Sequence, residues 1–469
     1  MRPVTLANAA TSLFTAIALV ALAGAVYAGE PPKTSPKPPD PKALAAPIAD
    51  ADKNLPRDND FVVHEWGTFT SFSGSDGISL DFRPLVDEDL PSFVLDRQKQ
   101  SFMNERREIA YAKGRTDKGL VISRQRMETP VTYFYTDRER IVDVMVEFPR
   151  GLLTEFYPPV RQFGPAYKKG QIESLENSWL RWGKIRLLPE SQALAKTGID
   201  PYIRKIESGE NPHYAYARET DSAHIQLTDP AMMSTYREKF LFYRGVGNFD
   251  LPVNLRASGD GRFILTQSGK TPLHYAFLVQ VDGDKSVRFS RYDNIRESVD
   301  MTLSNEALGM DALADEVVRA LVSEGLFEKE ARAMVKTWRA SWFGEPGTRV
   351  LYTLPQAYTD SLLPLHLDPA PREMVRVMVG RLETLTPEQE HRIEALVSQL
   401  GAADPVIRDQ TSAEIKKLGR FAEPALTRIA KLSDDPETQA HARTLLREVL
   451  VAKEVPLADD STAATPGKK

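Results

Sequence analysis

The chain has no cysteine among its 469 residues. Disulfide bonds, thiolate metal sites and cysteine nucleophiles are therefore excluded, and so is a lipid-modified cysteine at an export junction. The formal net charge at pH 7 is only −5. A nucleic-acid-binding domain normally has a basic surface and a high pI, so this composition argues against nucleic acid as a partner.

The sequence also lacks an apolar run long enough for a transmembrane helix. Residues 13–26 form an apolar run of about 14 residues, whereas a membrane-spanning helix needs about 20. Arg2 precedes this run, and the small residues Val26 and Ala28 stand at positions −3 and −1 of a cleavage site. This pattern predicts a signal peptide at residues 1–28, with an uncleaved anchor as the alternative.

The segment that follows, residues 29–57, is rich in proline, as in PPKTSPKPPDPK. Prolines at this density favour an extended, solvated chain and predict a disordered linker. A second disordered segment is expected at residues 454–469. Once the signal peptide is removed, the mature chain has no predicted transmembrane span. We therefore expect an exported protein that resides in the periplasm or outside the cell.

Common catalytic and ligand-binding motifs are absent as well. The chain contains no Walker loop, no G-x-S-x-G elbow, no H-E-x-x-H zinc motif and no EF-hand loop. His64 and Glu65 begin like the zinc motif, but Thr68 stands where the second histidine belongs. Adjacent side chains of a strand point to opposite faces, so this pair could not hold one ion without a bulge.

Residues 58–303 predict a β-rich body. In FVVHEWGTFTSFSG, residues 61–74, the side chains alternate as in a strand. Residues 131–135 and 141–148 flank a short polar loop and predict a hairpin, and Asp-Gly pairs mark two further turns. Further strands are expected at residues 180–188, 214–218, 239–243, 252–256, 262–266, 273–281 and 286–292. This pattern favours an antiparallel, sandwich-like architecture.

In residues 304–343 apolar residues recur at helical spacing and predict a helical hairpin, with Gly325 ending its first helix. Residues 344–385 predict strands that return to the β body. Residues 386–453 predict a helical tail that begins with Thr386 as N-cap. A further helical insertion is expected at residues 97–118. The expected fold class is α+β, with an antiparallel β-rich body, an inserted helical hairpin and a C-terminal helical tail.

Three carboxylates are candidate catalytic residues. Glu65 lies on an otherwise apolar strand face, where burial raises a carboxyl pKa toward the range of a general acid. Together with Glu128 and Glu155, which flank the predicted hairpin, it could form the carboxylate pair of a glycoside hydrolase. The alternative for Glu65 is a structural ion pair with an arginine such as Arg124, Arg126 or Arg349. An open pocket around Glu65 would support hydrolysis, and burial against an arginine would oppose it.

Aromatic and basic residues offer candidate ligand-binding positions. Trp66, Trp179 and Trp182 could form a sugar-stacking platform if they are exposed, although tryptophan in a strand is more often part of the core. Arg244 begins the loop RGVGN, whose backbone could approach a ligand, although a plain loop is the simpler interpretation.

Histidines offer a possible metal site. Four of them are scattered through the β body: His64, His213, His224 and His274. Together with carboxylates they could bind a metal ion. Their spacing matches no metal-binding motif, so neither a metal nor another cofactor is predicted.

Three groups of strings carry a resemblance to a known family: VHEWGTFTS; METPVTYFY with FPRGLLTEFYP; and GTRVLYTLP with VRVMVGRLETLTPE. They resemble a family of uncharacterised exported bacterial proteins of the planctomycete type, marked by the HEWGTFT motif, over residues 58–430. The pattern DPVIRxxxxxxIxxLGxxAxPAL, which reopens at Asp435, resembles HEAT-like repeats. This resemblance implies a helical protein-contact surface and assigns no activity or catalytic residue.

The expected function is that of an exported binding or structural protein that contacts a protein or an envelope polysaccharide. An extracytoplasmic glycan hydrolase that uses a carboxylate pair is the first alternative. A metal-binding envelope protein is the second.

Overall fold

The computed structural model describes residues 61–82, 94–96, 123–165, 175–189, 213–229, 234–259 and 261–450. The predicted signal peptide, the proline-rich linker, the insertion at residues 97–118 and the tail at residues 454–469 lie outside the described residues. No helix in the described part of the chain is both long enough and apolar enough to cross a membrane.

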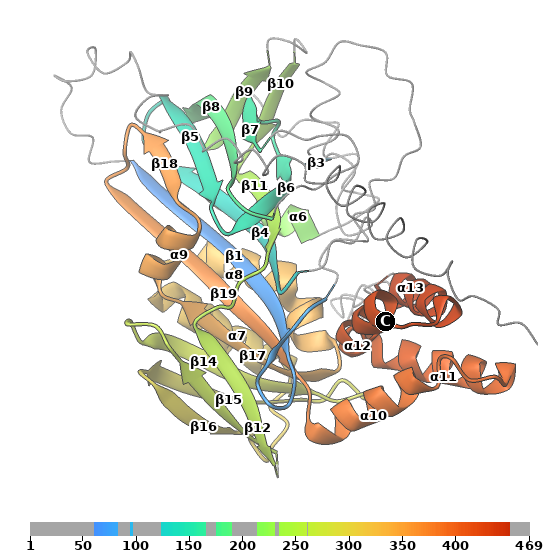
Figure 1. Cartoon of the computed structure of the whole chain (residues 1–469). Helices are drawn as coiled ribbons and strands as arrows, with labels where there is room; N and C mark the ends of the chain where they lie inside the picture. Colours follow the sequence, from blue (N-terminus) through green and yellow to red (C-terminus); the bar gives the residue numbers. More distant parts are fainter. Residues whose placement is uncertain are drawn as a thin grey trace, which may run out of the picture. The chain divides into compact units, whose positions relative to one another are not determined.

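A ten-stranded sheet forms the centre of the β body (Figure 1). Its strands follow the order β15 (Val287–Ile295), β14 (Leu273–Val281), β17 (Gly347–Leu354), β19 (Glu373–Thr384), β1 (Val62–Ser73), β4 (Gln125–Tyr135), β11 (Leu241–Gly247), β6 (Gly151–Tyr157) and β3 (Leu95–Asp96), and β2 (Ser79–Leu80) pairs with β1. Neighbouring strands are antiparallel except for β1 and β19, which are parallel. The motif strand β1 therefore lies beside a strand from the end of the body.

Two smaller sheets pack against one face of this large sheet. The first contains β10 (Ser234–Glu238), β9 (His224–Asp229), β8 (Ser178–Leu188), β5 (Arg140–Phe148) and β18 (Leu365–Asp368), with β7 (Gln162–Gly164) paired to β8. The second contains β12 (Val253–Gly259), β13 (Arg262–Gln267) and β16 (Ser298–Thr302). Apolar side chains alternate along β5, so that Val144 and Val146 share one core with Phe69 of β1. This shared core gives the body its sandwich-like character.

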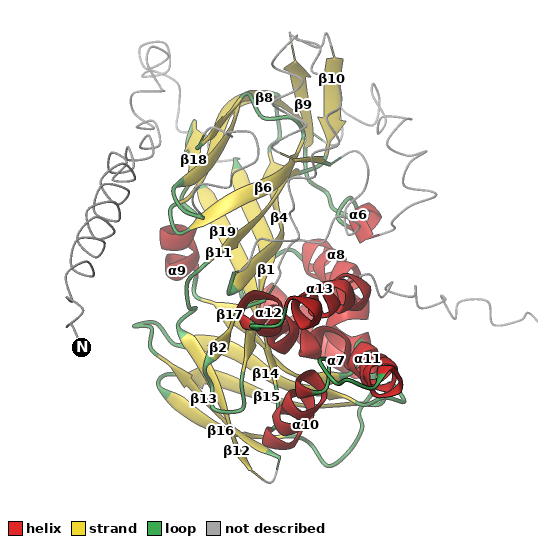
Figure 2. Ribbon diagram, turned by 45° about the vertical axis from the view of Figure 1, so that its right-hand side comes forward, coloured by secondary structure: helices red, strands yellow, loops and turns green. Residues whose placement is uncertain are grey.

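Helices cover the other face of the large sheet (Figure 2). They are α7 (Met310–Ser323), α8 (Glu328–Arg339) and the π-helix η2 (Ala340–Gly344), and Ala217 beside the short α6 (His213–Tyr216) joins the same core. Leu313 and Leu321 of α7 pack in one core with Trp66 of β1. Gly325 follows α7 with φ of 108°, a left-handed conformation that favours glycine.

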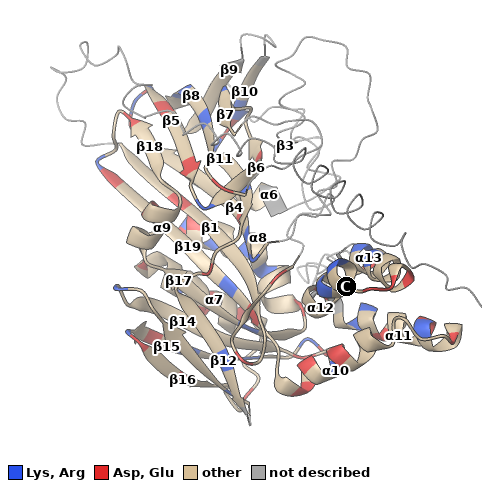
Figure 3. Cartoon of the chain, viewed as in Figure 1, with Lys and Arg blue, Asp and Glu red and all other residues tan. Residues whose placement is uncertain are grey.

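The tail contains α10 (Pro387–Ser398), α11 (Pro405–Leu418), the 3-10 turn η3 (Gly419–Ala422), α12 (Glu423–Leu432) and α13 (Pro436–Leu450). Its core is separate and apolar, with Ile393, Ile415 and Leu426 among its buried residues. Its charged residues, both acidic and basic, are visible along the helices in Figure 3. Glu390 links the tail to the body by accepting hydrogen bonds from Ser75 Oγ (2.6 Å) and Ser75 N (3.1 Å).

The structure confirms the α+β class with an antiparallel β-rich body, an inserted helical hairpin and a C-terminal helical region. It also confirms Thr386 as the N-cap of α10, since its side chain accepts from Gln389 N. The strand expected at residues 214–218 is wrong. Tyr216 belongs to α6, which packs beside α8, so the alternation of aromatic residues there does not mark a strand.

Candidate functional site

Strand β1 places Glu65 on the face of the large sheet that packs against the smaller sheets. Its Oε1 accepts hydrogen bonds from Thr132 Oγ1 (2.9 Å) and Tyr243 OH (2.7 Å). Its Oε2 accepts from Arg376 Nε (2.8 Å) and Nη2 (2.6 Å). The Glu65 and Arg376 side chains are 0% and 1% exposed. Because both oxygens are occupied and solvent is excluded, Glu65 is closed to a substrate in the described structure.

Arg376 is not one of the arginines that the sequence suggested for Glu65. It faces Glu65 in the parallel pairing of β1 with β19, and its Nη1 also donates to Asp360 Oδ1 (3.0 Å) of α9 (Gln356–Leu362). Burial, and after it the Glu65 charge, raises the pKa of Tyr243 well above its usual value, so this hydroxyl stays a donor. The expected arginines pair elsewhere: Arg124 with Asp81 and Asp250, Arg126 with Glu128, and Arg349 with Glu383.

His64 points to the opposite, helix-covered face of β1. Its Nδ1 lies 2.7 Å from Glu330 Oε2, and an ionised carboxylate only accepts, so the tautomer with Nδ1–H donates a hydrogen bond to Glu330. Glu330 also accepts from Phe327 N (2.9 Å) and Tyr135 OH (2.6 Å). Burial, followed by the Glu330 charge, raises the pKa of Tyr135. His64 thus connects β1 to the start of α8, while Glu65 connects β1 to β19 and β11.

Glu128 belongs to a second buried cluster, on the same face as His64. Its Oε1 lies 2.6 Å from Arg126 Nη2, and its Oε2 accepts from Thr70 Oγ1 (2.7 Å). Burial on its own would raise the pKa of Glu128, but Arg126, Arg244, Thr70 and Arg381 together lower it below its usual value. A general acid needs a raised pKa, so this environment keeps Glu128 ionised and unsuited to proton donation at neutral pH.

Glu155 and Arg244 lie beside this cluster. They face each other across the pairing of β6 with β11, and β11 is in turn the neighbour of β4, the strand of Glu128. The structure therefore brings three candidate residues, Glu128, Glu155 and Arg244, to one region of the sheet. Glu65 lies on the other face, so the carboxylate set that the sequence suggested is not assembled around it.

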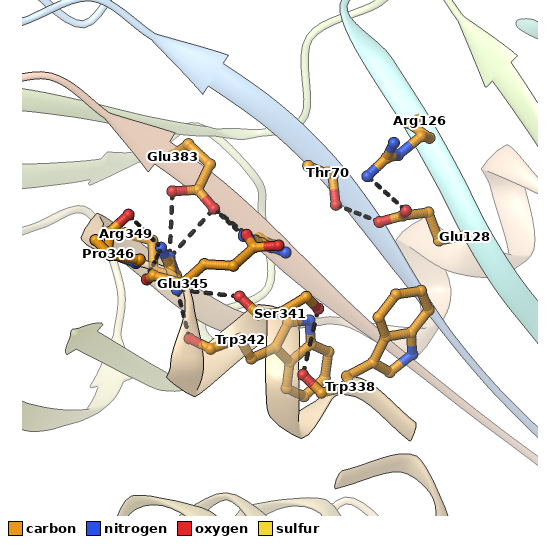
Figure 4. A network of polar contacts seen from close by, with 11 residues as sticks. Thr70, Arg126, Glu128, Trp338, Ser341, Trp342, Glu345, Pro346, Arg349 and Glu383 are labelled. Carbon is orange, nitrogen blue, oxygen red and sulfur yellow. Dashed lines mark hydrogen bonds and ion pairs between the residues drawn. The ribbon is translucent and has the colours of Figure 1, made fainter. Parts of the chain in front are cut away.

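A third buried cluster joins β17 and β19 to the end of the helical hairpin (Figure 4). Arg349 Nε donates to Glu383 Oε2 (3.2 Å), and its Nη1 donates to the carbonyl oxygens of Ser341 (3.1 Å) and Trp342 (2.7 Å). Arg381 donates from Nε to Glu383 Oε1 (2.5 Å) and from Nη2 to Glu345 Oε2 (2.7 Å). The guanidinium of Arg349 thus satisfies carbonyl groups at a helix end that have no partner within the helix.

The three candidate tryptophans do not form a platform. Trp66 is buried in the core under the helices, and Trp182 is buried in the core between the sheets, where its Nε1 donates to Pro158 O (2.9 Å). Trp179 is only partly buried and lies against Gly164 of the paired strand β7. Trp66 and Trp182 thus lie in the core, as tryptophans in strands more often do, and β8 alternation sends Trp179 and Trp182 toward different surroundings.

The candidate histidines are not gathered at one place either. His64 binds Glu330, His274 of β14 binds Glu324 (3.0 Å), His224 begins β9 and His213 begins α6. Within the described residues, no group of three or more histidine and acidic side chains is arranged to hold a metal ion. His64 and His274 each contact a single glutamate.

Several residues of these clusters were not predicted from the sequence, above all Arg376, Arg381 and Glu383 of β19. A signal for them is present in VRVMVGRLE, because charged residues in an apolar strand at the centre of a sheet must be buried in pairs. Glu330 gave a weaker signal, as an acidic residue in the first turn of a helix.

Comparison with known proteins adds no functional assignment. No protein-family model and no curated protein matches the chain. The solved structures that are similar to it include the yeast delta-COP-I mu-homology domain in complex with a Dsl1 WxWxV peptide (7% identity, TM-score 0.21) and the same yeast domain alone (8% identity, TM-score 0.22). Each covers 71% of this chain and 98% of its own. TM-scores this low support no argument about fold or function.

Proposed function

We propose that the chain is an exported binding protein without catalytic activity, and that its helical tail contacts a protein partner. The apolar run at residues 13–26 and the small residues after it support export. The observation that carries the binding role is the exposure of large apolar side chains at one end of the tail: Val406 is 59% exposed, Ile407 40% and Leu432 66%. The three residues stand at the ends of two helices of the tail, and apolar side chains that are exposed close together are typical of interaction sites.

The buried state of the candidate catalytic residues favours binding over glycan hydrolysis. Glu65 is saturated by Arg376, Tyr243 and Thr132, and the pKa of Glu128 is lowered. Neither carboxylate is set up to protonate a leaving group. The body therefore supplies a rigid support, and the tail supplies the contact surface.

Site-specific photo-crosslinking tests this proposal. A photoreactive amino acid replaces Leu432 in one sample and Ile141 in another, and each purified protein is incubated with an envelope extract of its source cell. Ile141 is the matched control because it is 58% exposed on β5. We expect a discrete cross-linked protein from position 432 and none from position 141. Equal cross-linking at both positions, or none at either, would contradict a tail-mediated contact.

A thermal-shift screen against divalent metals and envelope glycans tests the alternatives. We expect no change in melting temperature with any of them. A reproducible increase in melting temperature with a glycan would indicate a polysaccharide partner in place of a protein. An increase with a metal would support the metal-binding alternative.

A further inference from the structure

Two loops lie side by side at one end of the tail. A Cβ atom on Gly401, in the loop before α11, would lie 2.7 Å from Thr438 Oγ1 in the first turn of α13. The helices α11 and α13 then run next to each other, with Ser412 Oγ 3.0 Å from His441 Nε2. Gln439 Nε2 donates to Ser433 O (2.6 Å) and holds the end of α12 against the same turn. The starts of α11 and α13 and the end of α12 therefore meet.

The exposed apolar residues of the tail belong to these meeting ends. Val406 and Ile407 are in the first turn of α11, and Leu432 is the last residue of α12. We call these three residues the tail-end patch. By contrast, the exposed positions of α13 farther along the helix are small, polar or charged: Ala440, Arg443, Thr444, Arg447 and Glu448. Such a face suits the capped end of a helical array, so a further stacked helix is not expected there.

Acidic residues surround the tail-end patch. They stand in the same loops and in the first five residues of the helices that follow: Asp404, Asp409, Asp434, Asp435 and Glu437. Two basic residues, Arg408 and Lys431, share these segments, and Arg443 of α13 donates from its Nη2 to Ala430 O (3.3 Å) near the end of α12. Arg408 uses its Nη1 to donate to Ala402 O (2.6 Å), which fixes this charge against the loop backbone. The surroundings of the patch are therefore negative overall.

This charge decides between the possible occupants of the patch. A second copy of the chain would bring a second acidic rim against the first, and opposed like charges are costly. Anionic lipid and nucleic acid are disfavoured for the same reason. We propose that the tail-end patch binds a cationic amphipathic segment of a protein partner, whose apolar residues cover Val406, Ile407 and Leu432 while its lysines or arginines face the acidic rim. This inference rests on the proposed binding function and names the chemistry of its partner.

Peptide binding to the protein from residue 29 onward tests this inference by calorimetry. The probes are a leucine/lysine peptide with helical periodicity, a leucine/glutamate peptide of the same pattern, and a serine/lysine peptide. One variant carries V406S, I407S and L432S, and another carries D409K and D434K. The control variant is Ile141→Ser. All substituted positions except Asp409 and Ile141 lie in a loop or in the first or last turn of a helix, and circular dichroism checks that each variant is folded.

We expect the leucine/lysine peptide to bind the unaltered protein and the Ile141→Ser control equally, and to bind both other variants about tenfold more weakly, which corresponds to about 1.4 kcal/mol. The leucine/glutamate and serine/lysine peptides should bind the unaltered protein no more tightly than the leucine/lysine peptide binds the two substituted variants. Equal binding by the patch variant, or equal binding of the leucine/glutamate peptide, would overturn the inference. So would a dimer in sedimentation that the patch variant abolishes, since it assigns the patch to a second copy.

The outcomes for this inference and for the proposed function can be told apart. Cross-linking from position 432 without binding of the leucine/lysine peptide would retain a protein partner and reject its cationic amphipathic character. Loss of position-specific cross-linking would reject the proposed tail contact itself.

Discussion

The β body has deeply buried ion pairs in addition to exposed ones, whereas the ion pairs described in the helical tail are exposed. In the body the ion pairs Glu65–Arg376 and Glu383–Arg349 are at most 1% exposed on either side chain. In the tail, the pair Lys416–Glu448 has side chains that are 49% and 46% exposed, around a core of apolar residues. These ion pairs of the body are therefore withdrawn from water, whereas those of the tail lie at the surface, although the tail also has a buried carboxylate, Glu423 of α12.

The buried charges of the HEWGTFT motif connect β1 to other parts of the body. A buried charge is tolerated only when its partners are complete, and removing one partner leaves the other uncompensated. His64 and Glu65 each have such a partner on opposite faces of β1, in α8 and in β19. Adjacent motif residues thus connect β1 to two different parts of the body, which accounts for their proximity in sequence without a catalytic role.

The largest effect is expected for Glu65→Gln. Glutamine keeps the shape of the side chain but removes the charge, so the guanidinium of Arg376 loses its buried counter-ion. The free energy of unfolding should fall by about 3–5 kcal/mol. Urea unfolding measures this change, with Glu448→Gln of the tail as the matched control. A loss below about 1 kcal/mol would show that the pair does not hold the body together.

A smaller loss is expected for His64→Phe, which retains a ring but removes the donor to Glu330. A hydrogen bond to a charged group contributes about 1.5–3 kcal/mol, so the free energy of unfolding should decrease by that amount. His274→Phe provides the control, because His274 is exposed and its contact with Glu324 lies at the surface. Equal decreases in the free energy of unfolding in the two variants would show that the buried His64 contact stabilises the protein no more than a surface contact does.

The pH dependence of stability tests the Glu128 cluster. The pKa of Glu128 is lowered from 4.5 in the folded state, so the unfolded chain binds a proton more readily. The stabilisation is then fully present above pH 4.5 and is lost as the pH falls through the lower, folded-state pKa. In Glu128→Gln the free energy of unfolding should therefore fall less steeply as the pH is lowered from about 6 to about 3. An unchanged slope would contradict the lowered pKa.

The smallest effect is expected in the tail. Replacing both Lys416 and Glu448 by alanine removes an exposed ion pair between α11 and α13. Exposed pairs contribute about 0–1 kcal/mol, so the melting temperature should change little. Differential scanning calorimetry measures the change. A decrease in stability as large as that of Glu65→Gln would contradict the claim that buried ion pairs of the body contribute more than exposed pairs of the tail.

The sequence was informative about local structure. Apolar alternation predicted strands such as β5, helical spacing predicted α7 and α8, and Thr386 marked the start of α10. The alternation along residues 61–70 also predicted that His64 and Glu65 point to opposite faces. These features depend on neighbours within a few residues, and a single sequence displays them directly.

Contacts between distant residues could not be predicted in the same way. Glu65 and Arg376 are separated by 311 positions, and His64 and Glu330 by 266. Their meeting depends on the parallel pairing of β1 with β19 and on the packing of α8, which no local pattern specifies. The alternation in residues 214–218 failed for a related reason, because packing beside α8 overrides the local preference for a strand.

Double-mutant cycles on two ion pairs test the central contrast most directly. One cycle uses Glu65→Gln and Arg376→Met in the body, and the other uses Lys416→Ala and Glu448→Ala in the tail, with unfolding by urea in one buffer. We predict a coupling energy of about 2–3 kcal/mol for the body pair and at most about 0.5 kcal/mol for the tail pair. Equal coupling energies in the two cycles would contradict the account that buried charge pairs hold the β body together.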